Sequence, residues 1–109
     1  MASEKITNVE VKYKRGNEYE PELLKVTGLG PEDGRGDFGP GKVYYQAGTN
    51  WIAFAKCYVG AYDHGAPAMI ENVQKTSDIP QGVHNVTVAL DKDGPTGISA
   101  SDPLPVDFQ

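Results

Sequence analysis

The chain has 109 residues, of which 39% are hydrophobic, and its 10 basic and 15 acidic residues give a formal net charge of -5. A chain of this length is expected to form one domain over residues 1–109, and its acidity argues against a nucleic-acid backbone as partner. The 13 glycines and 8 prolines favour short strands joined by turns over long helices.

A single cysteine, Cys57, excludes an internal disulfide framework. No apolar stretch approaches the length needed to cross a bilayer, and the first residues lack the apolar core of a signal peptide. We therefore expect no membrane partner and a cytosolic or virion setting, although a module cut from a larger secreted protein would have the same features.

The first predicted strand covers residues 6–14, where apolar and charged residues alternate. One face holds Val9, Val11 and Tyr13, and the other holds Glu10, Lys12 and Lys14. This period of two predicts a strand with one solvated face at the edge of a sheet. Residues 18–27 are less clear because Pro21 interrupts them, and the six glycines of residues 28–41 predict a long exposed loop.

The longest apolar run, residues 51–62, predicts the central strand of the fold, preceded by a strand over residues 43–47 and a turn over residues 48–50. One face of the run would carry Trp51, Ala53, Ala55, Cys57, Val59 and Ala61. The other would carry Ile52, Phe54, Lys56, Tyr58, Gly60 and Tyr62. We expect the first face to be buried because it has no polar member. A helix is the alternative, since aromatic residues also recur at helical spacing, but Gly60 disfavours it.

The second half of the chain predicts further strands. In residues 83–90 one face carries His84, Val86, Val88 and Leu90, and in the closing strand Leu104, Val106 and Phe108 point inward. Residues 98–100 and 104–108 together predict this closing strand, with an interruption between them. Residues 69–76 fit either a strand or a single helical turn. The segment Asp91-Lys-Asp-Gly94 predicts a turn between strands.

Residues 79–94 resemble the penultimate strand of immunoglobulin-like sandwich modules. There, a Pro-x-Gly step such as Pro80-Gln-Gly82 leads to a corner residue, then to alternating valines and an Asp-Gly turn. His84 takes the place where such modules often carry a tyrosine that bonds to the backbone. Residues 48–65 and 101–108 resemble other strands of these modules, whereas residues 16–41 depart from the pattern. The resemblance implies an all-β fold, an immunoglobulin-like antiparallel β-sandwich with one long Gly-rich loop.

Aromatic side chains supply the first candidate binding surface. The outward face of the central hairpin would present Tyr44, Tyr45, Ile52, Phe54, Tyr58 and Tyr62. Tyrosine-rich patches are typical of protein interfaces and of sugar stacking. The alternative is that the Gly-rich loop covers this surface through Phe38.

The Gly-rich loop supplies the second candidate. Arg35, Gly36 and Asp37 form the tripeptide that integrins recognise on an exposed turn, although solubility and turn formation also explain them. Asp91 and Asp93 offer oxygen ligands for calcium, but their turn lacks the third ligand and the closing glutamate of the helix–loop–helix calcium site. No other cofactor is predicted.

Catalysis is not expected from this sequence. A cysteine nucleophile needs a base, His64 and His84 are the only histidines, and burial would raise the pKa of the Cys57 thiol. The sequence therefore predicts a non-catalytic binding or assembly module that contacts a protein partner or copies of itself. A carbohydrate-binding module with a calcium-bearing acidic turn and a self-associating virion or appendage subunit are the alternatives.

Overall fold

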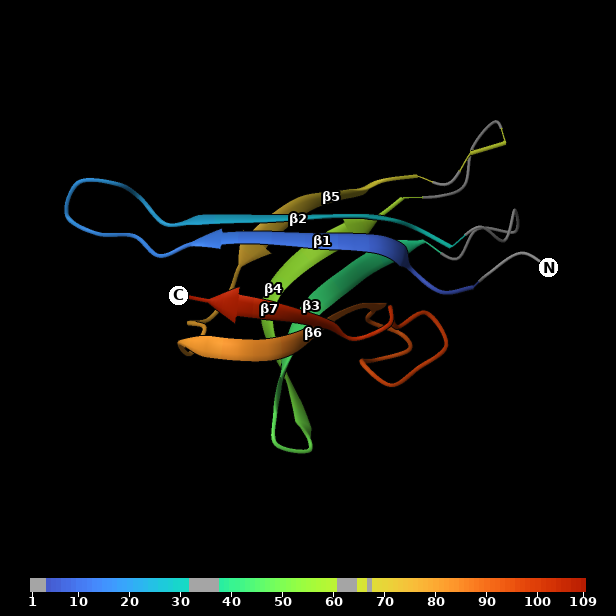
Figure 1. The fold of residues 1–109 in the computed structure, drawn as a ribbon. Helices are drawn as coiled ribbons and strands as arrows, with labels where there is room; N and C mark the ends of the chain where they lie inside the picture. The colour runs from blue at the N-terminus through green and yellow to red at the C-terminus, as the bar shows by residue number, and fades with distance from the viewer. Residues whose placement is uncertain (1–3, 32–37, 61–64, 67) are drawn as a thin grey trace.

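A computed structural model describes residues 4–31, 38–60, 65–66 and 68–109, and seven strands lie within them (Figure 1). The strands are β1 (Thr7–Lys14), β2 (Leu23–Leu29), β3 (Gly39–Ala47), β4 (Asn50–Val59), β5 (Ile70–Lys75), β6 (Gly82–Leu90) and β7 (Leu104–Phe108). Within the described residues, no helix has the length and hydrophobicity needed to cross a membrane. The predicted all-β class is confirmed, and of the undecided residues 69–76, Ile70–Lys75 form a strand.

The strands make two antiparallel sheets. β1 and β2 form a hairpin, and the other five strands form a sheet in the order β5-β4-β3-β6-β7. Figure 1 shows the hairpin lying across one face of the larger sheet. The alternating burial of β1 confirms a half-exposed strand at a sheet edge.

The core between the two sheets contains a chain of aromatic rings. Phe54 of β4 packs edge-on against Phe108 of β7 at 5.7 Å between ring centroids, and its ring lies tilted against Tyr45 of β3 at 5.9 Å. Tyr13 of the hairpin meets Phe108 at 5.4 Å. The aromatic contacts therefore join the hairpin to the larger sheet, and edge-on rings add to the gain from apolar burial. The inward faces predicted for β6 and β7 are confirmed.

The pairing of β3 with β4 is interrupted by one extra residue. Val43 pairs with Ala55, but the next residue of β3, Tyr44, pairs with Ala53. Phe54 is therefore left without a partner and forms a β-bulge. The bulge turns the Phe54 side chain into the core, where it is completely buried.

The bulge also reverses the facing of the residues before it. The Gln46 side chain lies on the outer face, where it accepts a hydrogen bond from exposed Asn85 at 3.2 Å. Trp51 pairs with Gln46 and shares that outer face, because directly opposite residues point the same way. The predicted buried face is confirmed for Ala55, Cys57 and Val59. It is wrong for Trp51 and Ala53, which lie on the outer face, and Phe54, predicted on the other face, is buried instead. Regular alternation does not anticipate a bulge.

The Gly-rich loop is shorter than predicted at both ends. β2 continues to Leu29 and β3 begins at Gly39, so strands take up part of the stretch. Gly41 lies in β3 because β6 passes close to it, and a Cβ at this position would lie 2.8 Å from the Ala89 carbonyl oxygen. Glycine here permits strand pairing, where the sequence predicted a loop.

The two ends of β1 are tied to the larger sheet. Before β1, the Ile6 backbone N–H donates to the Ser99 carbonyl at 2.9 Å. After β1, the Arg15 guanidinium donates to the carbonyls of Gln109 and Ile79 at 3.0 and 3.2 Å. These contacts close the edge between the two sheets at the ends of β1 and leave its middle free of strand partners on that side, among the described residues.

Glu22 makes a corresponding tie at the start of β2. Its carboxylate accepts hydrogen bonds from Lys75 Nζ of β5 at 2.9 Å and from the Tyr13 hydroxyl at 2.5 Å. Lys75, and then Tyr13, hold the pKa of Glu22 below its ordinary value. The hydrogen bond to Glu22 likewise raises the pKa of Lys75. The charged carboxylate is therefore favoured in the folded protein.

We expect Glu22→Gln to lower the free energy of unfolding at pH 7 by about 0.2–1 kcal/mol, the size of a partly exposed ion pair. Because the folded pKa is lowered, this contribution is present above the ordinary value of 4.5 and is lost as the pH falls through the folded pKa. Urea denaturation at neutral and strongly acid pH measures it. Glu71→Gln, at an exposed carboxylate for which the structure gives no ion pair, is the control. A difference that persists in strong acid would contradict the role of charge.

Candidate functional site

The structure divides the predicted aromatic surface between the two faces of the larger sheet. Tyr45 lies in the core, with its ring 5.9 Å from Phe54 and 5.4 Å from His84. Tyr44 and Tyr58 lie on the outer face, where Tyr58 is 40% exposed and Tyr44 is buried among its neighbours. Tyr45 and Phe54 therefore support the fold and offer nothing to a partner.

Three predicted site residues, Arg35, Asp37 and Tyr62, lie outside the described residues. The candidate calcium ligands are described. Asp91 makes an ion pair with Lys42 at 3.6 Å, and the Asp93 backbone N–H donates to the Leu90 carbonyl at 3.0 Å. Across the described ranges, no group of three or more potential metal-ligating side chains is found.

Cys57 is buried against the inner face of β3. Burial, and then the charge of Asp91, raises the pKa of its thiol from 9.0 to about 11. The thiolate, which is the nucleophilic form, is therefore scarce at neutral pH. This is the environment of a structural cysteine.

We expect iodoacetamide to modify native Cys57 at least about 100-fold more slowly than the same residue in urea. The rise in pKa alone lowers the thiolate fraction about 100-fold, and burial slows access further. Mass spectrometry over time gives the two rates. A Cys57→Ala, Ser77→Cys variant, with its thiol at an exposed position, is the control and should react at the unfolded rate. Rapid labelling of native Cys57 would contradict the buried environment.

A groove between β1 and β7 is the main feature that the sequence did not reveal. Each strand lies at the edge of its sheet. Figure 1 shows them side by side and running in the same direction. Within the described residues no strand pairing joins them, so both present unpaired backbone groups to the space between.

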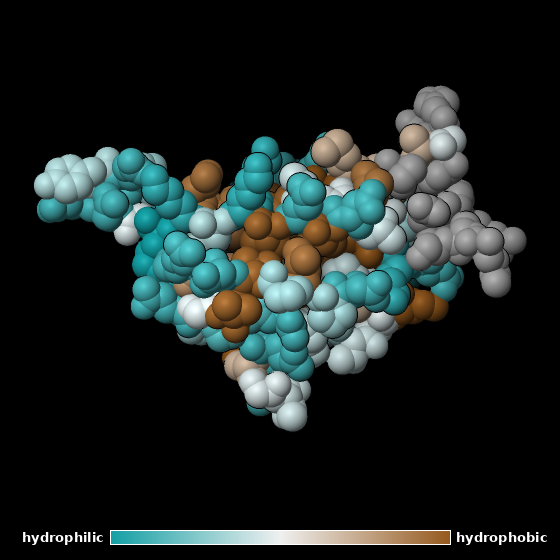
Figure 2. Space-filling view, in the orientation of Figure 1, coloured by the Kyte–Doolittle hydropathy of each residue, from teal (hydrophilic) through white to brown (hydrophobic). Residues whose placement is uncertain are grey.

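The groove consists of two hollows that meet at Val9 and Leu104. The larger, of about 570 Å³, is lined by residues 9–13 of β1 and residues 104–107 of β7. The smaller, of about 420 Å³, is lined by residues 6–9 and 101–104. Figure 2 shows hydrophobic atoms reaching the surface in the middle of this face, between the two strands. The ties at the ends of β1 bound the groove.

The two edges of the groove differ in what they can offer to a bound segment. Pro105 of β7 has no backbone N–H, and proline is a common guard of exposed edges. β1 has no proline, and its half-buried Val9 and Val11 alternate with exposed Glu10 and Lys12. β1 is therefore the edge that can pair from Glu10 to Lys14, beyond the irregularity that interrupts its pairing with β2 between Thr7 and Glu10.

Comparison of the chain with known protein families, with curated proteins and with solved structures finds no match. The charged face of residues 6–14 predicted one of the two edges of the groove, and the prolines at positions 103 and 105 are a signal that could have indicated the other. The two edges face each other because of the way the β1–β2 hairpin packs on the larger sheet. Local sequence patterns hold no information about that packing.

The outer face of the larger sheet is a second candidate surface. Trp51 is half-buried there and lies opposite Gln46. The side-chain oxygen of Gln46 accepts a hydrogen bond from the Asn85 side chain of β6. Tyr58 lies on the same face toward the other end of β4. An aromatic ring beside two side-chain amides can stack on a sugar and hydrogen-bond its hydroxyls.

Proposed function

We propose that the protein is an immunoglobulin-like β-sandwich that acts as a non-catalytic binding module, with the groove between β1 and β7 as its contact site. The observation that carries the proposal is the pair of unpaired strand edges flanking a partly apolar hollow. Exposed edges are templates for pairing with another chain. The partner that fits is an extended peptide segment.

Recognition in this groove would combine two contributions. Backbone N–H and C=O groups of β1 would form hydrogen bonds with the backbone of the segment, and these bonds do not depend on the segment's sequence. Alternate side chains of the segment would enter the hollow and pack on Val9, Val11 and Leu104, because successive residues of a strand point to opposite sides. The groove would therefore select segments with apolar residues at every second position.

Selection of binders from a random peptide library tests this proposal. We expect the selected peptides to alternate in hydrophobicity and to slow amide hydrogen exchange in residues 9–13. Val11→Asp, which places a charge on the groove wall, should weaken binding at least about tenfold. Thr27→Asp, on the neighbouring strand β2, is the matched control and should bind normally. Selected peptides that bind both variants equally would overturn the proposal.

The outer face supports carbohydrate binding as a second candidate function, because the bulge turns Trp51 outward beside the Gln46 and Asn85 amides. Trp51 is the only tryptophan, so its fluorescence reports directly on this surface. A sugar that stacks on the ring should change the emission, and Asn85→Ala should weaken binding of the same sugar. Unchanged emission across a broad glycan panel, with and without calcium, would exclude this function.

A further inference from the structure

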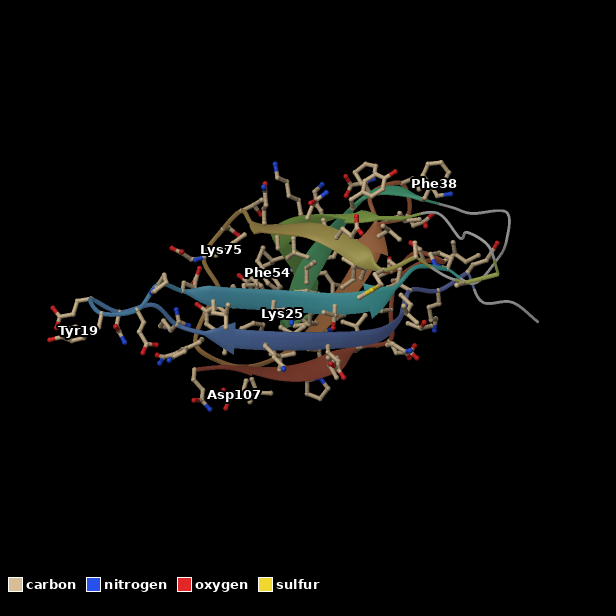
Figure 3. All side chains as sticks on the ribbon, turned by 90° about the horizontal axis from the view of Figure 1, so that it is seen from above. Tyr19, Lys25, Phe38, Phe54, Lys75 and Asp107 are labelled. Carbon is tan, nitrogen blue, oxygen red and sulfur yellow. The ribbon has the colours of Figure 1, made fainter. Side chains whose placement is uncertain are left out.

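The connection between β1 and β2 forms a projecting arm, defined here as residues 15–22. Figures 1 and 3 show the arm extending beyond the body of the molecule, with Tyr19 labelled at its far end in Figure 3. Tyr19 is 85% exposed, the highest value among the large hydrophobic residues described. A large ring held so far from the core contributes nothing to folding and is available for contact.

The arm is held in one shape by its own hydrogen bonds. The Asn17 side-chain oxygen accepts the backbone N–H groups of Tyr19 and Glu20 at 2.8 and 2.9 Å, and the Asn17 N–H donates to the Glu20 carbonyl at 2.9 Å. Lys14 forms an ion pair with Glu20 at the base of the arm. The backbone that carries Tyr19 is thus held before any contact, which reduces the entropy lost on binding.

The arm and the groove complement each other in chemistry. The Tyr19 ring fits a hollow with apolar walls, and tyrosine is a common central residue of interfaces. Glu18 lies next to Tyr19 in the arm, and Lys12 lies on the rim of the groove. Among the described residues the structure gives no ion pair for either side chain. Opposite charges at the two positions would fix orientation.

The direction of the arm determines which groove it can reach. The arm prolongs the hairpin, and the groove runs alongside β1 of the same hairpin (Figure 1). The arm points away from its own groove, so a groove can receive an arm only from another molecule. Such a contact joins two different surfaces, and it repeats from copy to copy along the hairpin direction.

We propose that the protein assembles head to tail, with the arm of one copy seated in the groove between β1 and β7 of the next. Tyr19 enters the hollow beside Val11, and Glu18 pairs with Lys12 of the receiving copy. This inference rests on the groove of the proposed function and names its occupant as a second copy of the chain, whose arm enters as a turn through one ring instead of pairing along β1 as an extended segment would. An open assembly retains one free arm at one end and one free groove at the other, so growth is open-ended unless the rotation between copies closes a ring.

A complementation experiment tests the assembly. Light scattering and sedimentation should show that the mass of the wild-type protein rises with concentration. Tyr19→Ala removes the arm contact and Val11→Asp blocks the groove, so each variant alone should be monomeric, with association at least about 30-fold weaker. Their equimolar mixture should form dimers and stop there, because only the intact arm of one and the intact groove of the other can pair. Urea denaturation verifies that each variant folds.

Surface charge reversals provide a second test that leaves the core untouched. Glu18→Lys and Lys12→Glu should each weaken association, and the double variant should restore it. Tyr58→Ala, on the outer face of the larger sheet, should leave assembly unchanged. Assembly that survives both Tyr19→Ala and Val11→Asp would overturn the inference. A wild-type protein that stays monomeric while selected peptides still bind the groove would overturn the assembly and leave the binding function intact.

Discussion

Replacing Phe54 with alanine should lower the free energy of unfolding by about 3–5 kcal/mol, the range for removing a buried aromatic side chain. Phe54 is completely buried, and its ring contacts Phe108 of β7 and Tyr45 of β3. Its removal therefore leaves a cavity and also ends two ring contacts, so neighbours cannot easily close the space. For a domain with a total stability of about 5–15 kcal/mol, this is a large fraction.

Urea denaturation followed by circular dichroism measures this loss, with the slope of the transition as a check that the unfolded state is unchanged. Tyr58→Ala is the matched control, since it removes an aromatic ring from the same strand on the exposed face. We expect Tyr58→Ala to cost less than about 1 kcal/mol. Similar losses for the two variants would mean that the bulge does not place Phe54 in the core.

The all-β class and most strand positions could be predicted because they depend on local alternation. β6 and the inward side chains of β7 follow period two without interruption, and the structure agrees. The alternation failed at Phe54, where an extra residue in β4 moves one aromatic side chain inward and turns Trp51 outward. Bulges are set by pairing with a neighbouring strand, so a single strand read alone does not reveal them.

The candidate site could be predicted only in part, because it depends on the docking of two sheets. The charged face of residues 6–14 identified one edge strand, and Pro105 was visible in the other. The two edge strands lie side by side because of contacts between residues far apart in the sequence, such as Ile6 with Ser99 and Tyr13 with Phe108. Residues 18–22 of the arm fall in a stretch that the sequence leaves unclear, because their shape depends on the hydrogen bonds of the Asn17 side chain and not on periodicity.

The segment that precedes β7 shows how side-chain hydrogen bonds can replace strand pairing. The sequence predicts that residues 98–100 form the first part of an interrupted closing strand, but the structure has no strand there. Instead, Ser101 Oγ accepts the Val88 N–H at 2.9 Å and Ser99 Oγ accepts the Leu90 N–H at 3.1 Å. Both serines are buried. Two hydroxyls thus satisfy β6 amides that have no other partner on this side, at the point where β7 has not yet begun.

Replacing both serines with alanine should lower the free energy of unfolding by about 2–6 kcal/mol, because each change leaves a buried N–H without an acceptor at about 1–3 kcal/mol. Single variants at Ser99 and Ser101 should each show part of the loss, and amide exchange at Val88 and Leu90 should accelerate in the matching variant. Ser77→Ala removes an exposed hydroxyl bonded to the Ala53 carbonyl at 3.1 Å and should cost less than about 1 kcal/mol. If Ser101→Ala proved as mild as this control, water would have to reach the Val88 amide, and the end of β6 would be more open than its burial indicates.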